Sequence, residues 1–211
     1  MPNTYKELRR TVVGTATGTV TLDLTGISGY TDLIVVMSPI SSSGQRQVYM
    51  EINGDTGANY SRTILSGTGS AAVSARNSNQ NQTYLDYYGV VETTQTNKII
   101  QFMNYSNTTT FKTMLTRSND TSLGLDAIVH LWRSTAAITQ IKFYIDAVNF
   151  AVGSTFSLYG IANADLTIAR DDHLPALAHR KDGGAVPTGE LVVGHRCLLP
   201  FGCIWACHAE K

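Results

Sequence analysis

The chain has 211 residues, and its 16 lysines and arginines balance 16 aspartates and glutamates, so its formal net charge is zero. Only 15% of its residues are charged, where about 25% is usual, which argues against a surface that grips nucleic-acid phosphates. A hydrophobic content of 43% with 18 glycines and 5 prolines is typical of a globular protein and excludes disorder throughout the chain. The length indicates one domain, or one domain with an appendage.

The sequence lacks the signals of membrane insertion and secretion. No run of about 20 apolar residues is present, and residues 1–10 lack the apolar centre of a secretion signal. We therefore expect a soluble protein, made in a cytoplasm. All three cysteines lie within the last fifteen residues, so no disulfide framework holds the main body together.

Alternating apolar and polar residues predict β-strands. The period of two is clearest in residues 19–24, 48–52 and 141–145. Further short apolar segments flanked by Gly, Asn, Ser or Asp are predicted as strands at 33–37, 84–91, 99–103, 111–115, 125–132 and 156–161. No helical pattern of ten or more residues separates them. The predicted fold is all-β, an antiparallel, jelly-roll-like β-sandwich of about ten strands before residue 163.

Two segments between the strands are predicted as turn and loop. Residues 53–57, Asn-Gly-Asp-Thr-Gly, tolerate positive φ angles and suit a tight reversal after a strand. Residues 66–82 contain two glycines and a run of Asn and Gln, so we expect an exposed, mobile loop there.

The composition changes after residue 162. All ten tyrosines lie at or before Tyr159, whereas four of the five histidines and every cysteine lie beyond it. We expect a sandwich domain at 1–162 and an irregular C-terminal arm at 163–211, too short and turn-rich for a core of its own. The arm is predicted to attach the protein or pack against a neighbouring subunit through its apolar end, which includes Cys197, Phe201, Cys203, Trp205 and Cys207.

A metal site in this arm is the alternative. His195 and His208 flank the cysteines, but the cysteines are spaced C-x5-C and C-x3-C rather than in the C-x2-C pairs that suit tetrahedral zinc. We therefore expect no metal and no other cofactor.

Four stretches carry a family resemblance: Tyr30–Leu33, Asn53–Ser61, Trp132–Ile138 and Asn149–Ile161. In this order they resemble a β-sandwich module of tailed-bacteriophage virion proteins, including tail-fibre and head-fibre components. The resemblance covers roughly residues 5–162. It implies a non-enzymatic, trimeric particle component, of a kind sometimes associated with binding surface sugars.

The last of these stretches also has a physical interpretation of its own. Gly153 and Gly160 bracket a strand in which Phe156 and Leu158 are expected to face the core, and Ser154 can hold the entry turn by local hydrogen bonds. The motif therefore indicates a structural scaffold and does not indicate a catalytic activity.

Acidic residues offer two candidate chemistries. Glycoside hydrolysis needs two carboxylates about 5 to 9.5 Å apart, and Asp86, Asp120 and Asp126 are available, although each is also explained by a turn or by the solvent face of a strand. No activated nucleophile or tuned base is recognisable, so we expect no enzyme. Asp55, with Asn53 and Asn59, offers oxygens to calcium, but hydrogen bonding within the turn is the simpler interpretation.

One strand carries bulky side chains on both faces. Ile128, His130 and Trp132 share one face, and residues 127, 129 and 131 share the other. The Trp132 indole can close one end of the core, fill a subunit contact or stack on a sugar ring. On the last interpretation His130, Trp132, Tyr84 and Tyr88 are the candidate binding residues.

These observations favour a bacteriophage virion structural protein, located in the virion and made in the host cytoplasm. We expect a surface-exposed fibre or tail component, assembled as a homotrimer, that binds other virion proteins and host-surface carbohydrate but no nucleic acid. A capsid decoration protein that stabilises the shell is the first alternative, and a carbohydrate-binding module or glycan-degrading enzyme is the second.

Overall fold

The computed structural model describes residues 5–162, which form twelve strands in two antiparallel sheets and contain no helix. The large sheet contains, in spatial order, β1 (Tyr5–Val12), β12 (Thr155–Ala162), β3 (Tyr30–Ser38), β8 (Asn97–Phe102), β9 (Lys112–Asp120), β10 (Gly124–Trp132), β5 (Tyr60–Gly67) and β6 (Ala72–Gln80). The small sheet contains β2 (Thr19–Asp23), β11 (Gln140–Ile145), β4 (Val48–Ile52) and β7 (Thr83–Tyr84). The predicted all-β sandwich is confirmed. The predicted arm at 163–211, with Cys197, Phe201, Cys203, Trp205 and Cys207, lies outside the described residues.

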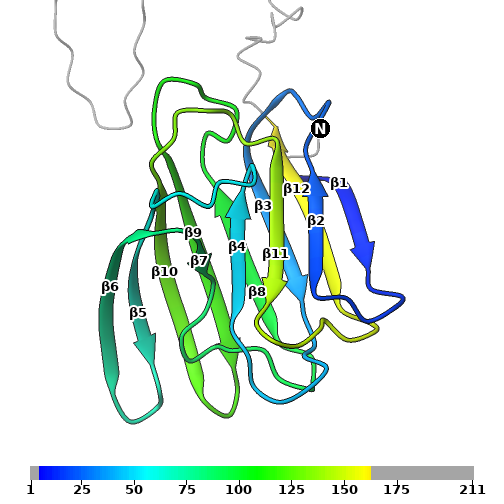
Figure 1. The fold of residues 1–211 in the computed structure, drawn as a ribbon, viewed down its shortest axis with the longest axis vertical. Coiled ribbons are helices and arrows are strands. Elements are labelled where there is room, and N and C mark those ends of the chain that lie inside the picture. Colours follow the sequence, from blue (N-terminus) through cyan, green and yellow to red (C-terminus); the bar gives the residue numbers. More distant parts are fainter. Residues whose placement is uncertain (1–4, 163–211) are drawn as a thin grey trace, which may run out of the picture. The chain divides into compact units, whose positions relative to one another are not determined.

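The chain crosses repeatedly from one sheet to the other (Figure 1). β1 and β3 belong to the large sheet while β2 and β4 belong to the small one, and β12 returns at the end to lie between β1 and β3. The two ends of the described segment are therefore hydrogen-bonded neighbours. Such non-local pairing is typical of jelly-roll-type sandwiches.

Alternation places the core between the sheets, as the sequence predicted. In β4 and β11 the inward side chains Val48, Met50, Ile141 and Phe143 are fully buried, and they pack with inward residues of the large sheet such as Phe156. Each fully buried aliphatic or aromatic side chain contributes about 1.5–3 kcal/mol to folding. Phe156 and Leu158 face the core, as expected for β12.

Gly153 precedes β12, but Gly160 lies within the strand and does not end it as predicted; each glycine is required by its surroundings. Gly153 adopts a φ of +90° in the entry turn, where the Ser154 hydroxyl donates to the carbonyl of Ala151 at 2.8 Å. At Gly160 a Cβ atom would lie 2.4 Å from the Tyr30 ring, so only glycine allows this ring to pack on the strand.

Two segments differ from their prediction. Most of residues 66–82 belongs to the β5–β6 hairpin and not to a loop. β6 is an edge strand whose side chains are half-buried or exposed, so it carries no apolar alternation, and its hydrogen bonds to β5 define it. Conversely, 84–91 is mostly loop after the two-residue β7, because Leu85 and Val91 enter the core from a loop.

Candidate binding site

The structure places His130 and Trp132 inside the sandwich. Their exposed fractions are 0% and 2%, whereas Val129 on the opposite face of β10 is 51% exposed. The hypothesis that these two rings contact a sugar is therefore wrong. The inward face of β10 takes the larger rings because polar partners are available there, and the interpretation that the indole belongs to the core is confirmed.

The Trp132 indole is fixed by the turn between β4 and β5. Its Nε1 donates to Asp55 Oδ2 at 2.7 Å, and the same carboxylate accepts from the Gly57 N–H at 2.8 Å and from Asn59 Nδ2 at 2.9 Å. Burial raises the pKa of Asp55, but these hydrogen bonds outweigh it and leave the pKa below its ordinary value. Both carboxylate oxygens are engaged by N–H groups, which supports turn hydrogen bonding over a calcium site.

We expect Trp132→Phe to lower the free energy of unfolding by about 1.5–3 kcal/mol, since a hydrogen bond to a charged acceptor is lost while most of the ring packing remains. Urea denaturation followed by circular dichroism measures this. Asp55→Ala should then lower the free energy of unfolding by less in the Trp132→Phe background than it does in the wild type. Additive effects of the two changes would contradict the coupling.

His130 is held by a threonine on each side. Its Nδ1 lies 2.8 Å from Thr83 Oγ1 on β7, and its Nε2 lies 2.9 Å from Thr116 Oγ1 on β9. Burial, and then the charge of Arg62, lowers the pKa of His130 from 6.5 to about 3. The imidazole is therefore neutral at physiological pH and ties the small sheet to the large one.

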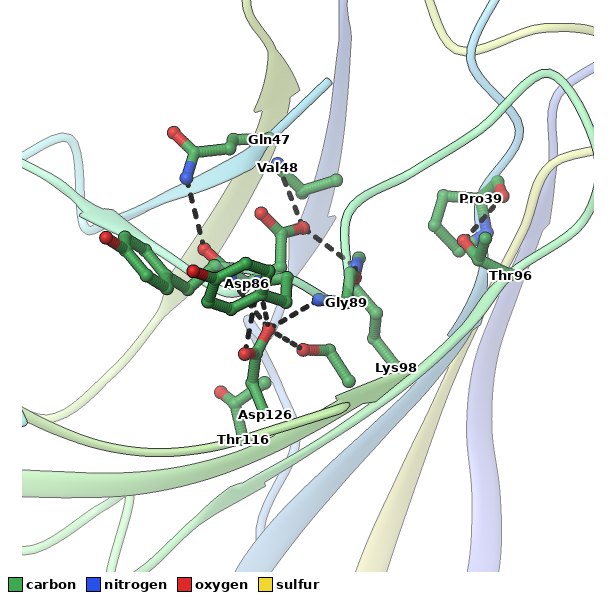
Figure 2. A network of polar contacts seen from close by, with 12 residues as sticks. Pro39, Gln47, Val48, Asp86, Gly89, Thr96, Lys98, Thr116 and Asp126 are labelled. Carbon is green, nitrogen blue, oxygen red and sulfur yellow. Dashed lines mark hydrogen bonds and ion pairs between the residues drawn. The ribbon is translucent and has the colours of Figure 1, made fainter. Parts of the chain in front are cut away.

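A second polar group lies under the loop between β7 and β8. Lys98 on β8 and Asp86 in the loop form an ion pair of 2.7 Å, and both side chains are fully buried. Lys98 Nζ also donates to the carbonyl of Gly89, and Asp86 Oδ2 accepts from the Val48 N–H at 3.2 Å. Figure 2 shows Lys98 reaching from its strand toward Asp86 and the loop backbone.

Asp126 on β10 holds the same loop through its backbone. Its carboxylate accepts from the N–H groups of Tyr87 at 2.7 Å, Tyr88 at 3.1 Å and Gly89 at 2.7 Å (Figure 2). The Ser66 hydroxyl adds a bond of 2.5 Å. Burial raises the pKa of Asp126, but the bonds from Ser66 and the loop outweigh it, so the pKa lies below its ordinary value.

Of the two interpretations given for Asp86 and Asp126, the solvent face of a strand is therefore wrong, because these residues are buried at 0% and 2% exposure. Burial raises the pKa of Asp86 to about 6 in spite of Lys98, so two neighbouring carboxylates have pKa values shifted in opposite directions, a pattern also found in hydrolases. Here, however, the acids are enclosed and bonded to the loop. Asp120 fits its prediction as a turn residue, since it accepts from the N–H groups of Ser122 and Leu123.

Tyrosines gather on the outer face of the small sheet. Tyr144 on β11, Tyr49 on β4 and Tyr84 on β7 are neighbours in register. The rings of Tyr49 and Tyr144 stack with centroids 5.2 Å apart, and Tyr84 meets Tyr49 edge-on at 6.1 Å. The Arg62 guanidinium lies 3.2 Å from the centroid of the Tyr84 ring.

A groove of about 480 Å³ adjoins this tyrosine row. Its lining comes from the segment before β4, from β4 itself, from the β7–β8 loop, from the β9–β10 turn and from the residue after β11: Gln45, Arg46, Gln47, Tyr49, Tyr87, Tyr88, Val90, Leu123 and Asp146. Of the candidates from the sequence, Tyr88 lines the groove, and Tyr84 does not line it but packs against Tyr49, which does. Tyr49, Tyr87 and Tyr144 were missed, although Tyr49 and Tyr144 occupy polar-face positions in alternating strands, where an aromatic residue is itself a signal.

The outer face of the large sheet is different in character. Leu65 and Leu125 are each 59% exposed, Val129 is 51% exposed and Val36 is 36% exposed. Register places Leu65 beside Ala127 and Val36 beside Ile99, with Arg117 of β9 between Ala127 and Ile99, so apolar side chains lie on both sides of this arginine. We call Leu65, Leu125, Val129, Ile99 and Val36 the apolar patch.

Comparisons with family models, with curated proteins and with solved structures found no match to this chain. Within the described residues 5–162, no helix is long and apolar enough to cross a membrane.

Proposed function

We propose that the chain is a structural protein of a tailed-bacteriophage virion, exposed on the particle as a fibre or tail component, which acts by binding and not by catalysis. Its sandwich assembles as a homotrimer through the apolar patch and leaves the small sheet free for other partners. The virion assignment depends on the four stretches that resemble the phage module. The assembly depends on the apolar patch, which is the observation that carries the proposal.

The resembling stretches contact one another in two pairs. The Asn53 side chain donates to the carbonyl of Ala137 at 2.8 Å, which joins the second stretch to the third. Tyr30 packs on Gly160, which joins the first to the fourth. These contacts support the interpretation that the resembling residues are parts of the folding scaffold and not of a catalytic site.

The apolar patch supports self-association. Leu65, Leu125 and Val129, at 51–59% exposure on the adjacent strands β5 and β10, leave apolar area in water, and its removal contributes about 25 cal/mol for each Å² buried. A closed trimer places the same face of every copy around its axis, which covers three patches at once. Arg117 is paired with Ile99 on one side and Ala127 on the other, so its charge lies within the patch and needs an acidic or polar partner in the subunit interface.

Sedimentation equilibrium of the full chain tests the assembly. The wild type should have about three times the 22.9 kDa mass of the chain, and the double variant Leu65→Glu, Val129→Glu should be monomeric and still folded by circular dichroism. Thr21→Glu, on the exposed face of the small sheet, is the matched control and should remain trimeric. A folded wild type that is monomeric throughout the micromolar range would contradict the proposal.

The place on the particle is tested with virions that lack the protein. Loss of adsorption to cells with unchanged heat resistance supports a fibre or tail component. Loss of heat or osmotic resistance with unchanged adsorption would instead support the capsid decoration alternative.

A further inference from the structure

We propose that the groove between the small sheet and the β7–β8 loop binds a saccharide, with sugar rings stacked on Tyr49, Tyr87 and Tyr88. The inference rests on the proposed function, since it names the site for the host-surface partner. The volume of about 480 Å³ lies within the range of about 300–1,000 Å³ for small-ligand sites.

Aromatic surface is available at the groove. Tyr87 is 38% exposed, and its ring meets that of Tyr88 edge-on at 5.0 Å, so the two rings present planes at 86° to each other. Tyr49 supplies a third ring from the sheet and is kept in place by stacking on Tyr144. A pyranose has an apolar C–H face that packs on such rings, while its hydroxyl groups point outward.

Polar groups with both donor and acceptor capacity surround the rings. Gln45, Gln47, Arg46 and Asp146 line the same groove. Gln47 Nε2 is held by the Asp86 carbonyl at 3.3 Å, and its Oε1 lies 3.5 Å from the Tyr49 hydroxyl. The Tyr49 phenol donates to this Gln47 oxygen and keeps its lone pairs as acceptors for a ligand hydroxyl.

The buried ion pair supports the loop that carries two of the three rings. Tyr87 and Tyr88 have their backbone N–H groups fixed by Asp126, and Lys98 joins Asp86 to the Gly89 carbonyl. A buried ion pair adds little net stability compared with apolar packing. Its effect here is to order a loop before any ligand arrives, which lowers the entropy cost of binding.

The groove chemistry favours a saccharide over other ligands. Arg46 and Asp146 carry opposite charges, so no single-sign field attracts nucleic acid or another polyanion. Gln, Arg and Asp side chains around aromatic rings match a ligand whose hydroxyl groups both donate and accept.

A glycan array of neutral and charged bacterial surface oligosaccharides, probed with the full-length chain, tests the inference. The oligosaccharide that binds most strongly is then titrated by isothermal calorimetry into the wild type and its variants. Tyr87→Ala should weaken binding about tenfold, whereas Tyr87→Phe should remain within about threefold because the stacking plane is kept. Gln47→Ala should also weaken binding, through lost hydrogen bonds.

Tyr5→Ala is the matched control, since Tyr5 is 59% exposed on β1, in the other sheet, and should leave the affinity unchanged. A folded chain that binds nothing on the array, or a bound glycan whose affinity is the same in wild type and Tyr87→Ala, would overturn the inference. So would a partner that proves to be a protein competing at this groove. The oligomeric state of each variant is also measured by sedimentation. A trimer that binds no saccharide overturns only the proposed saccharide site, and a monomer that binds saccharide overturns only the proposed trimer.

Discussion

Replacing Lys98 with methionine should lower the free energy of unfolding at pH 7 by about 3–5 kcal/mol. The side chains of Lys98 and Asp86 are both 0% exposed and lie 2.7 Å apart. Methionine leaves a buried carboxylate without its cation and the Gly89 carbonyl without the Lys98 ammonium donor. Urea denaturation with extrapolation to water measures the loss.

Two controls separate this effect from a general sensitivity to substitution. Lys142→Met removes the other ion pair described by the structure, Lys142 with Glu51 at 2.9 Å, where the Lys142 side chain is 35% exposed, and should cost at most about 1 kcal/mol. The double variant Asp86→Asn, Lys98→Met should regain part of the stability lost in Lys98→Met. If Lys98→Met were as mild as Lys142→Met, the buried pair would not have the energetic role given to it.

His130→Gln should change how stability depends on pH. The imidazole has a pKa of about 3 in the folded chain and near 6.5 when unfolded. Below pH 6.5 the unfolded chain binds a proton at this imidazole that the folded chain does not bind. The stability contributed by the neutral imidazole is therefore present above pH 6.5 and is lost as the pH falls toward 3. At pH 4.5 the loss amounts to about 3 kcal/mol.

The measurement is the free energy of unfolding of both proteins at pH 7 and pH 4.5. The wild type should lose about 3 kcal/mol more than His130→Gln between these values, because the carboxylates titrate in both proteins and largely cancel. Parallel pH profiles would mean that His130 is not held neutral in the folded state.

The strands of the core could be predicted because their signal is local. Val48, Met50, Ile141 and Phe143 alternate with polar neighbours, and burial of one face is sufficient to specify β4 and β11. β6 could not be predicted, since an exposed edge strand has no apolar face and is defined by hydrogen bonds to β5. Whether these residues form a strand depends on the hydrogen bonds that β5 offers as well as on their own side chains.

The polar interior was beyond sequence reasoning for a different reason. Lysine and aspartate are mostly exposed residue types and histidine is intermediate. Lys98, Asp86, Asp126 and His130 are each buried with a partner from another strand or loop. The pairing of Asp86 with Lys98 spans twelve residues and a loop, and no pattern in the sequence indicates it. The same contacts assemble the groove from distant segments.

Tyrosines on both outer faces allow one measurement to show that ligand binds at the groove beside the small sheet and not on the large sheet. The full chain is labelled with 3-fluorotyrosine, and its ¹⁹F spectrum is recorded during titration with the oligosaccharide selected on the array. The signals of Tyr49, Tyr87 and Tyr88 should move, while those of Tyr5 and Tyr159, on β1 and β12 of the large sheet, should stay unchanged. Movement of Tyr5 or Tyr159, or unchanged groove signals at saturating ligand, would contradict binding at the groove.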